Sequence, residues 1–443
     1  MKVSCTCSGW ILLGAILASP VAQAASPFIV GVCSHLMYEQ EPTGQANRMM
    51  RDAGISSVRI DAHWGHAERA RGRLLIEPSW KRYLAGTESY GLATMFILGY
   101  GNYFYGDGKK PRTQPVRDAF ERYAGFIAES FKGRVTHYEI WNEWDHESPR
   151  DPQFSRDYVK LVAQTTQRLR KTDPNARILA GAVTSEGIQS GFAQRIVDDG
   201  VMDLVDGLSL HPYVHCYGSE RSTPEAWINW MREVDADLSE RAGRPVPLYL
   251  TEMAWPAHEG HCGFPERVQA AYLARSYLLA RTVPNIKGMW WYDIRNDGTN
   301  PKEREHNFGL LRQDMQIKPA YEVLAAISEV VVHYVYDGIQ QSDDPDVMLL
   351  RFSRGQDQLL AGWSIGKPRQ VRIRSTAGAA GKLELIDTER AIRRRHSSTA
   401  EWHCSDGNDC LSEVILNEFP KLISLGAAST ELSAEKVVLP PGS

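Results

Sequence analysis

Two stretches of this sequence each place a glutamate beside a tryptophan after a run of strand-forming residues. Residues 138–145 read YEIWNEWD and contain Glu143, and residues 247–255 read PLYLTEMAW and contain Glu252. Charged side chains are rarely buried without a partner. A carboxylate at the carboxyl end of a strand is therefore typical of chemistry at the mouth of a parallel barrel. The alternative is a strand end with an exposed carboxylate and packing tryptophans.

Two carboxylates on separate strand ends are what glycoside hydrolysis requires. One carboxyl group protonates the leaving oxygen, and the other attacks the sugar or activates a water molecule. The recurrence of the pattern, with Glu143 in one stretch and Glu252 in the other, favours chemistry over two unrelated strand ends.

The pair Asn142-Glu143, followed later in the chain by Glu252, resembles clan A of the glycoside hydrolases. In that clan the acid/base and the nucleophile end strands four and seven of a (β/α)₈ barrel, which implies Glu143 as acid/base and Glu252 as nucleophile. Three further segments resemble family thirty-nine and its relatives, including bacterial exopolysaccharide hydrolases of the PslG type. These segments are WYD at 291–293, EHNFGL at 305–310 and KPAY at 318–321. The resemblance covers most of residues 28–331.

The resemblance extends to two polar residues at the predicted site. Arg59, in the segment VRID at 58–61, matches the clan's arginine, which hydrogen-bonds the nucleophile and keeps it ionised. Asn142 matches the residue that holds the 2-hydroxyl of the sugar. A surface salt bridge is the alternative for Arg59, but its place within an apolar strand disfavours that interpretation.

His211-Pro212-Tyr213 ends the predicted sixth strand. The resemblance implies that Tyr213 hydrogen-bonds Glu252 and that His211 lines the site. Taken alone, the pair would be read as a core histidine and a core tyrosine. The presence of both glutamates favours the functional interpretation.

Tryptophans are expected to bind sugar, because the apolar faces of sugars pack on aromatic rings. Trp291 matches the clan's tryptophan on strand eight, which implies that it forms the floor of the site, with Trp290 facing the other way. Trp64, Trp144 and Trp255 are further candidate platforms. Each of these could instead belong to the core.

Strand and helix patterns alternate over most of the chain, which predicts a parallel sheet. Eight strand-helix units in the predicted domain, residues 25–331, fit one barrel with elaborated loops. The predicted strands are residues 28–33, 57–64, 93–100, 135–141, 178–183, 204–213 and 288–294, with the seventh in the stretch 247–255 that carries Glu252. The clearest predicted helices are residues 120–131, 157–172 and 265–283.

The pattern changes after about residue 331. Short strands such as 347–352, 358–363 and 370–374 are separated by tight turns. Residues 332–443 are therefore predicted to form an accessory domain of the β-sandwich type. A structural role for this domain is the commoner case, and glycan binding is the alternative.

Residues 1–24 read as a secretory signal, with Lys2, an apolar run at 11–21 and a small-x-small site at 22–24. The apolar run is too short for an ordinary membrane span, although an uncleaved anchor is the alternative. We therefore expect a secreted or periplasmic protein with no membrane span after cleavage.

Five cysteines follow the predicted signal, and an oxidising compartment would pair four of them. Cys404 and Cys410 are close enough to staple a turn. Cys216 and Cys262 follow neighbouring strands and are predicted to bridge their loops. Cys33 lies in an apolar strand, which predicts a buried free thiol.

Other classes of protein fit the sequence less well. The net charge of −4 disfavours nucleic acid as the main partner. His63-x-x-His66 and His258-x-x-His261 have ligand spacing but lack the H-E-x-x-H pattern, so no metal site is predicted. The sequence has no phosphate-binding loop, no dinucleotide fingerprint and no G-x-S-x-G motif.

The sequence therefore predicts a secreted, retaining glycoside hydrolase, with β-linked substrates and no cofactor implied by the resemblance. The loop at 99–108, with four aromatic residues among glycines, suggests endo action on a bacterial exopolysaccharide. An exo-acting β-xylosidase-like enzyme is the alternative, since the loop would also serve as a lid. A catalytically silent glycan-binding protein of polysaccharide export is the alternative from another class. A monomer is expected.

Overall fold

The computed structural model describes residues 27–38, 43–375, 382–391, 397–401, 403–405, 409–426 and 432–436. The predicted signal, residues 1–24, lies outside these ranges, so it stays a prediction. Within the described ranges, no helix combines the length and the apolar character that crossing a bilayer requires.

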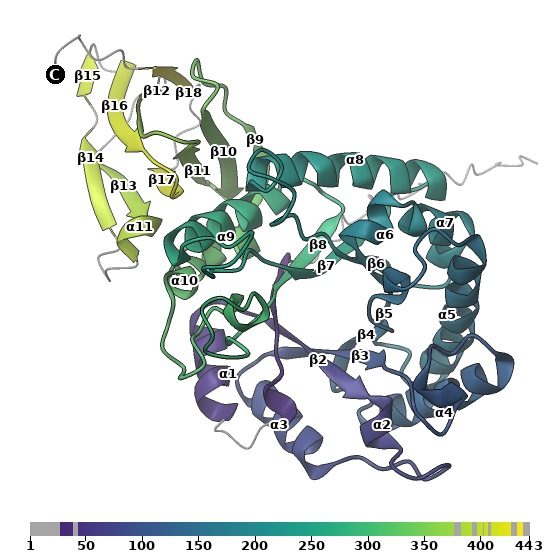
Figure 1. Ribbon diagram of the computed structural model, residues 1–443. Helices are drawn as coiled ribbons and strands as arrows, with labels where there is room; N and C mark the ends of the chain where they lie inside the picture. The colour runs from purple at the N-terminus through teal and green to yellow at the C-terminus, as the bar shows by residue number, and fades with distance from the viewer. Residues whose placement is uncertain are drawn as a thin grey trace, which may run out of the picture.

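Eight parallel strands close into a barrel in chain order, and β1 pairs with β8 to complete the ring (Figure 1). The strands are β1 Ile29–Cys33, β2 Ser57–His63, β3 Ala93–Gly99, β4 Val135–Ile140, β5 Arg177–Thr184, β6 Gly207–His211, β7 Leu248–Met253 and β8 Ile286–Trp291. The predicted (β/α)₈ barrel is confirmed. The sixth strand is shorter at both ends than the predicted 204–213, and it ends before Pro212, which has no backbone N–H to donate to a neighbouring strand.

Helices cover the outside of the barrel (Figure 1). They are α1 Thr43–Asp52, α2 Trp64–Ala67, α3 Pro78–Ser89, α4 Gln114–Ser130, α5 Pro152–Thr172, α6 Ser185–Gln189, α7 Phe192–Asp198, α8 Pro224–Ala242, α9 Glu266–Ala280 and α10 Pro319–His333. The α5 helix begins five residues earlier than predicted. Asp151 caps it by accepting a hydrogen bond from the Gln153 backbone N–H, and Pro152 suits the first position.

The interior of the barrel is filled from inward-facing positions of its strands. Trp290 packs there with Cys33, Met95, Leu179 and Tyr249. Gly31 on β1 makes room for it, because a Cβ at that position would come within 2.3 Å of Trp290 Cδ1. Side chains alternate along a strand, so the placement of Trp290 inside the barrel decides which way its neighbours point.

The C-terminal strands form two antiparallel sheets. A six-stranded sheet has the order β14-β13-β17-β11-β10-β9, and a four-stranded sheet has the order β15-β16-β12-β18. The strands are β9 Val335–Ile339, β10 Val347–Arg354, β11 Asp357–Ser364, β12 Arg369–Ser375, β13 Lys382–Asp387, β14 Ser397–Glu401, β15 His403–Ser405, β16 Asp409–Leu416, β17 Lys421–Gly426 and β18 Leu432–Lys436, with α11 at Thr388–Ala391. Val371 and Leu416 from the small sheet share one apolar cluster with Leu349 and Leu360 from the large sheet.

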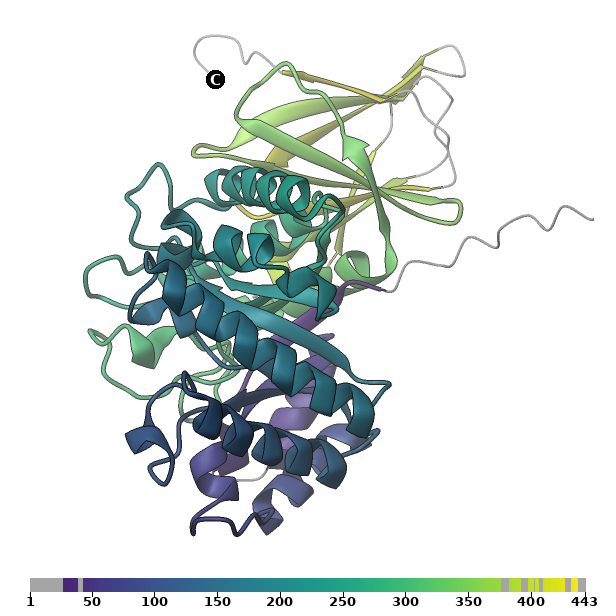
Figure 2. The ribbon, with the colours of Figure 1, turned by 90° about the vertical axis from the view of Figure 1, so that its right-hand side faces the viewer.

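The six-stranded sheet also packs against the barrel helices (Figure 2). Along β10, Leu349 points toward the small sheet, whereas Leu350 and Phe352 point to the opposite face and pack with the apolar core of the barrel. Trp363 Nε1 donates a hydrogen bond to Glu225 Oε1 of α8 at 2.8 Å. Both faces of the large sheet are therefore buried, one by the barrel and the other by the small sheet.

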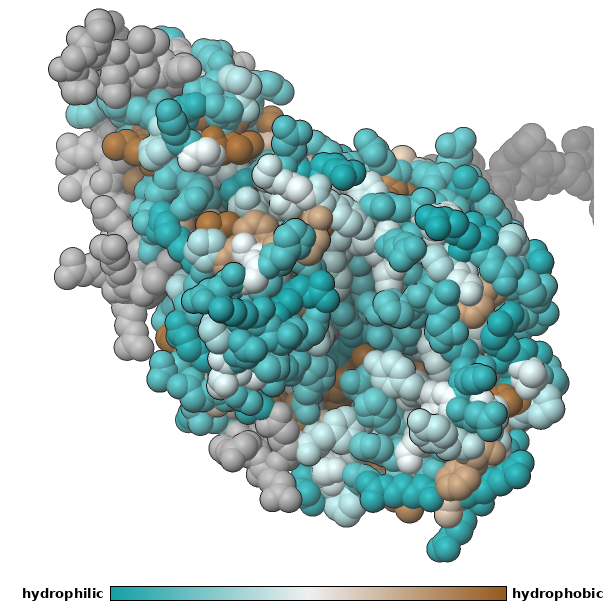
Figure 3. Space-filling model, viewed as in Figure 1, coloured by the Kyte–Doolittle hydropathy of each residue, from teal (hydrophilic) through white to brown (hydrophobic). Residues whose placement is uncertain are grey.

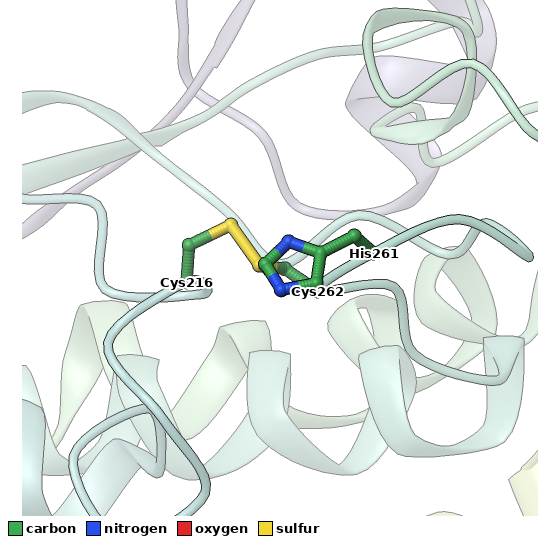
Figure 4. Close-up of side chains that lie close together, drawn as sticks. All are labelled: Cys216, His261 and Cys262. Atoms are coloured by element: carbon green, nitrogen blue, oxygen red, sulfur yellow. A yellow bond between two sulfur atoms is a disulfide. The ribbon is translucent and has the colours of Figure 1, made fainter.

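A disulfide joins Cys216, in the loop after β6, to Cys262, in the loop after β7 (Figure 4). It is one of the two predicted pairs. Cys404 lies opposite Cys410 in the register of β15 and β16, and Cys410 is disulfide-bonded, but the side chain of Cys404 lies outside the described residues. Cys33 carries a free buried thiol that donates to the Thr251 carbonyl oxygen.

Candidate active site

The carboxyl ends of the barrel strands surround a cavity of about 490 Å³. Space-filling representation shows a depression on this face of the molecule, where hydrophilic side chains prevail (Figure 3). The residues brought together here include Arg59 of β2, Asn142 and Glu143 after β4, and Glu252 of β7. Parallel strands expose their carboxyl ends on one side, so residues far apart in sequence converge.

Arg59 is the centre of the polar contacts beneath this cavity. The side chain is buried, with 2% exposed. Its Nη1 donates to Glu252 Oε1 at 2.6 Å, and its Nη2 donates to Asn142 Oδ1 at 2.8 Å. On its other edge it is paired with Glu139 of β4, at 2.6 Å from Nη2 to Oε2. The surface salt bridge considered for Arg59 is therefore excluded.

The carboxylate of Glu252 is held in the ionised form. Burial alone would raise its pKa, but the charges of His211 and Arg59 and the hydrogen bonds from Arg59 and Tyr213 lower it below its ordinary value. The Tyr213 hydroxyl donates to Glu252 Oε2 at 3.0 Å. Both oxygens of Glu252 thus accept hydrogen bonds, which fixes the plane of the carboxylate.

Glu143 lies across the cavity from Glu252 and is more open to solvent, with 29% of its side chain exposed. Its backbone is left-handed, with φ 49° and ψ 53°. That conformation costs a non-glycine residue about 1–3 kcal/mol and persists where the surroundings impose it. The buried Trp144 that follows it provides such an anchor, packing on Phe154 and Tyr158.

His211 links the two carboxylates. Its Nδ1 donates to Glu143 Oε1 at 2.9 Å and lies 3.7 Å from Glu252 Oε2. Burial lowers the pKa of His211, but the charge of Glu252 and the hydrogen bond to Glu143 outweigh it and raise the pKa above its ordinary value.

The three side chains lie close enough to act on one bond. One atom each from Glu143, His211 and Glu252 falls within 4.8 Å of the others. Retaining glycosidases separate their carboxyl groups by about 5–5.5 Å, whereas inverting enzymes separate them by about 6.5–9.5 Å to admit a water molecule. The short separation of Glu143 and Glu252 suits direct attack on a sugar by one carboxylate.

The predicted tryptophan platforms are wrong. Trp64, Trp144, Trp255 and Trp291 each have 0% of their surface exposed. Their indole N–H groups donate to Glu68 Oε2 and to the backbone carbonyls of Phe154, Ser222 and Phe308, respectively. A ring buried inside the protein cannot stack on a sugar. The core alternative is therefore correct for Trp64, Trp144 and Trp255, and the floor expected from Trp291 is wrong.

Tyr292 and Phe308 line the cavity where Trp291 was expected. Because Trp290 points into the barrel, Trp291 points outward to the helices and Tyr292 turns inward again. The alternation of side chains could have identified Tyr292 from the sequence if the inward position of Trp290 had been known. The Tyr292 hydroxyl lies 3.5 Å from Asp297 Oδ2.

His35 of the segment after β1 also lines the cavity, although it belongs to no motif that could have identified it from the sequence. Its Nδ1 donates to Asp297 Oδ1 at 2.9 Å and lies 3.9 Å from Asp293 Oδ2. Burial lowers its pKa, but the contacts with Asp297 and Asp293 raise it to about 9.

Three clusters in the described part of the chain contain residue types that bind metals. They are Cys216, His261 and Cys262; His35, Asp293 and Asp297; and Glu143, His211 and Glu252. The first contains the disulfide, whose sulfurs are joined to each other, with the His261 ring beside them (Figure 4). The other two are explained by hydrogen bonds between their own members. Neither His63 nor His258 belongs to any of them.

A second cavity of about 380 Å³ continues the first beyond Glu143. The two share Tyr100, Asn142, Glu143 and His146 in their walls. The second is bounded by the loop after β3, through Gly101 and residues 108–110, and by the loop after β4. The cleft therefore extends on the side of Glu143 that lies away from Glu252.

Solved structures share this architecture. A family 39 glycoside hydrolase from Bacteroides cellulosilyticus WH2 matches with a TM-score of 0.74 and 24% identity, covering 90% of this chain and 81% of the other. The chain has the fold of clan A glycoside hydrolases. A monomeric β-xylosidase from Caulobacter crescentus matches at 0.59 and 14% identity, over 92% and 98% of the two chains. A family 30 endoxylanase from Clostridium papyrosolvens matches at 0.61 and 12% identity, over 90% and 96%.

Sequence comparison is less informative. No protein-family model matches the chain, and no curated protein matches it by sequence. At the identities found, the structural matches establish the fold.

Proposed function

We propose that this protein is a retaining glycoside hydrolase that cleaves β-linked glycosidic bonds. The observation that carries the proposal is the approach of Glu143 and Glu252 within 4.8 Å across one cavity, with Arg59 and Tyr213 holding Glu252 ionised. One carboxyl group then serves as acid and the other as nucleophile. The fold shared with clan A enzymes supports the same assignment.

In the first step, Glu252 attacks the anomeric carbon while Glu143 gives its proton to the departing glycosidic oxygen. The bond from carbon to the leaving oxygen breaks, and an ester between Glu252 and the sugar forms. His211 donates to Glu143 Oε1, which leaves Oε2 to carry the catalytic proton. Asn142, oriented by Arg59, is placed to donate to the 2-hydroxyl of the sugar.

In the second step, Glu143 removes a proton from water, and the water oxygen attacks the anomeric carbon. Glu252 leaves as a carboxylate, and the product keeps the configuration of the substrate. Tyr292 and Phe308, which line the cavity, provide the aromatic surface for the sugar in place of the buried tryptophans.

Leaving-group dependence tests the two roles. Glu252→Gln is expected to abolish turnover of every aryl β-glycoside in a panel, because no nucleophile remains. Glu143→Ala is expected to cost about 10²–10⁴-fold for substrates with poor leaving groups and much less for dinitrophenyl glycosides, which need little proton assistance. Equal losses across leaving groups in Glu143→Ala would reject its role as the acid.

The finer proposal is endo action on a bacterial exopolysaccharide. The cleft that continues past Glu143 gives room for sugars on the leaving-group side. Tyr103 is 87% exposed and Phe104 43% exposed on the loop after β3, whereas Tyr105 stacks on Trp64 beneath them. Two of the four loop aromatics are thus open to solvent. Early digestion products separated by chromatography would be mixed oligosaccharides for endo action and monosaccharides for exo action.

An exo-acting β-xylosidase is the second candidate function. The observation that favours it is the likeness of the whole chain to the β-xylosidase from Caulobacter crescentus. Release of xylose from xylo-oligosaccharides, without larger products, would support this candidate over the first.

A catalytically silent glycan-binding protein would need none of the charge arrangement described above. Arg59, Tyr213, His211 and both glutamates are all present and in contact, which favours the enzyme. Binding of a polysaccharide with no turnover of any substrate would favour the silent protein.

Secretion or periplasmic location is proposed on the predicted signal at residues 1–24. The Cys216–Cys262 disulfide supports an oxidising compartment.

The two C-terminal sheets are proposed as an accessory β-sandwich with a structural role, since the barrel buries one face of the large sheet. A monomer is proposed, and light scattering would test it.

A further inference from the structure

Glu139 lies beneath Arg59 inside the barrel, on the same strand that leads to Glu143. It is 0% exposed, its Oε2 accepts a hydrogen bond from Arg59 Nε at 2.8 Å, and the same oxygen forms an ion pair with Arg59 Nη2 at 2.6 Å. Its Oε1 has no hydrogen-bond partner among the described residues. A buried carboxylate with one oxygen unsatisfied is destabilising unless other interactions compensate for it.

Glu139 cannot act on a substrate directly. The described residues that line the active-site cavity do not include it. Among the described residues its side chain is hydrogen-bonded to Arg59, and that guanidinium also reaches Glu252 Oε1 and Asn142 Oδ1. A guanidinium is a rigid planar fork, so fixing one edge determines where the other edge points.

Glu139 also changes the charge that Glu252 experiences. The single positive charge of Arg59 is divided between two carboxylates, those of Glu139 and Glu252. When Glu252 bonds to a sugar carbon it loses its negative charge. An Arg59 paired with Glu252 alone would stabilise the ionised carboxylate more strongly and would oppose that bond, especially in a buried site.

We propose that Glu139 is a positioning residue for the proposed glycosidase reaction. It holds Arg59 in the orientation that reaches Glu252 and Asn142, and it offsets part of the guanidinium charge. This inference rests on the proposed function. The competing explanation is structural, in which Glu139 only neutralises a buried arginine.

The pH dependence of Glu139→Gln separates the two explanations. The amide oxygen of glutamine still accepts a hydrogen bond from Arg59, but the negative charge is gone. Glu252 then experiences more of the Arg59 charge, so its pKa falls further. The acid limb of kcat/KM is expected to move down by about one pH unit. At the pH optimum, kcat/KM is expected to fall about tenfold, the factor that matches one pKa unit.

Other charged and titratable groups around Glu252 stay unchanged in this variant. They are Cys33 from β1, Arg59 from β2, Tyr100 after β3, Glu143 after β4, His211 and Tyr213 at the end of β6, and Tyr292 after β8. Besides Arg59, the hydroxyl of Tyr158 on α5 is near enough to sense the charge of Glu139.

Glu68→Gln is the matched control. Glu68 is buried, accepts hydrogen bonds from Trp64 Nε1 and the Gly72 backbone N–H, and does not contact Arg59. The Glu68→Gln variant is expected to have a lower Tm and an unchanged acid limb in the pH profile of kcat/KM. If Glu139→Gln behaves like Glu68→Gln, with a lower Tm and an unchanged limb, the inference is overturned. The midpoint of the limb does not depend on how much of the sample is folded.

A second readout does not need turnover. Carbon NMR of glutamate-labelled protein reports the titration of Glu252, assigned by its absence in Glu252→Gln. A lower midpoint in Glu139→Gln supports the inference even if the wild type hydrolyses no glycoside, whereas that lack of hydrolysis would reject the proposed function alone. If Glu139→Gln does not fold, Glu139→Asp keeps the charge and is expected to lower kcat without moving the limb. A moved limb in Glu139→Asp would contradict the inference.

Discussion

His211 Nδ1 donates a hydrogen bond to Glu143 Oε1 at 2.9 Å while lying 3.7 Å from Glu252 Oε2. One imidazole therefore serves both carboxylates. Because the pKa of His211 is raised and that of Glu252 is lowered, the two groups carry opposite charges over the intermediate pH range. The acid limb of activity should then lie below 4.5, the ordinary pKa of a glutamate.

Replacing His211 by asparagine should move that acid limb upward. Asparagine keeps a side-chain N–H near Glu143 but removes the positive charge that lowers the pKa of Glu252. With the charge gone, Glu252 takes up a proton at a higher pH, by about one unit or more. The pH profile of kcat/KM measures the shift, and an acid limb that does not move would show that His211 is uncharged beside Glu252.

Substitution of Tyr292 should mainly impair catalysis, whereas substitution of its neighbour Trp291 should mainly lower thermal stability. Tyr292→Ala removes an aromatic wall of the cavity, and a contact of about 1–1.5 kcal/mol corresponds to roughly tenfold in kcat/KM. Trp291→Phe loses a buried indole N–H bond to the Phe308 carbonyl, so it should lower the Tm with a smaller effect on kcat/KM per folded molecule. Kinetics and thermal unfolding of both variants test the contrast. It would be contradicted if Trp291→Phe had the larger kinetic effect.

The convergence of the polar residues at one site could be predicted from the sequence. The motifs that contain them lie at the carboxyl ends of strands, and these ends meet on one side of a parallel barrel. Arg59 and Tyr213 both hydrogen-bond Glu252, and His211 lines the cavity, as the resemblance implied. The aromatic residues could not be assigned in the same way. Whether a tryptophan faces the cavity or the helices depends on packing that a single sequence does not specify, and Trp291 is the example.

Gly31→Ala should destabilise the barrel, because its Cβ would overlap the Trp290 ring at 2.3 Å. Overpacking of a core typically costs about 1–3 kcal/mol of unfolding free energy. Gly65→Ala is the matched control, since nothing lies within 4 Å of a Cβ there. Urea unfolding should show a lower midpoint for Gly31→Ala alone. Equal midpoints for the two variants would mean that Trp290 does not fill the barrel interior.

Peptide mapping under non-reducing conditions should find Cys216 joined to Cys262 and Cys404 joined to Cys410, with Cys33 free. Removing the first bridge by Cys216→Ser with Cys262→Ser should cost about 2–4 kcal/mol, because it frees a long loop in the unfolded chain. Cys33→Ser provides a single-site control. The assignment would be wrong if Cys33 appeared in a disulfide or if every cysteine were alkylated without reduction.

The barrel itself was predictable because its strands and helices alternate in the chain. The first and last residues of individual helices and strands were less predictable, because they depend on contacts outside the periodic pattern. Asp151 illustrates this point: its cap starts α5 before the apolar periodicity begins. The left-handed backbone of Glu143 likewise has no signature in residue type, because the surrounding structure imposes it.

The stereochemistry of the first product tests the central claim most directly. Proton NMR recorded in the first minutes of hydrolysis of an aryl β-glycoside distinguishes the anomers before they equilibrate. Double displacement by Glu143 and Glu252 predicts that the β-anomer appears first. Initial appearance of the α-anomer would contradict the account, because it would require a water molecule between the two carboxylates in place of a bond to Glu252.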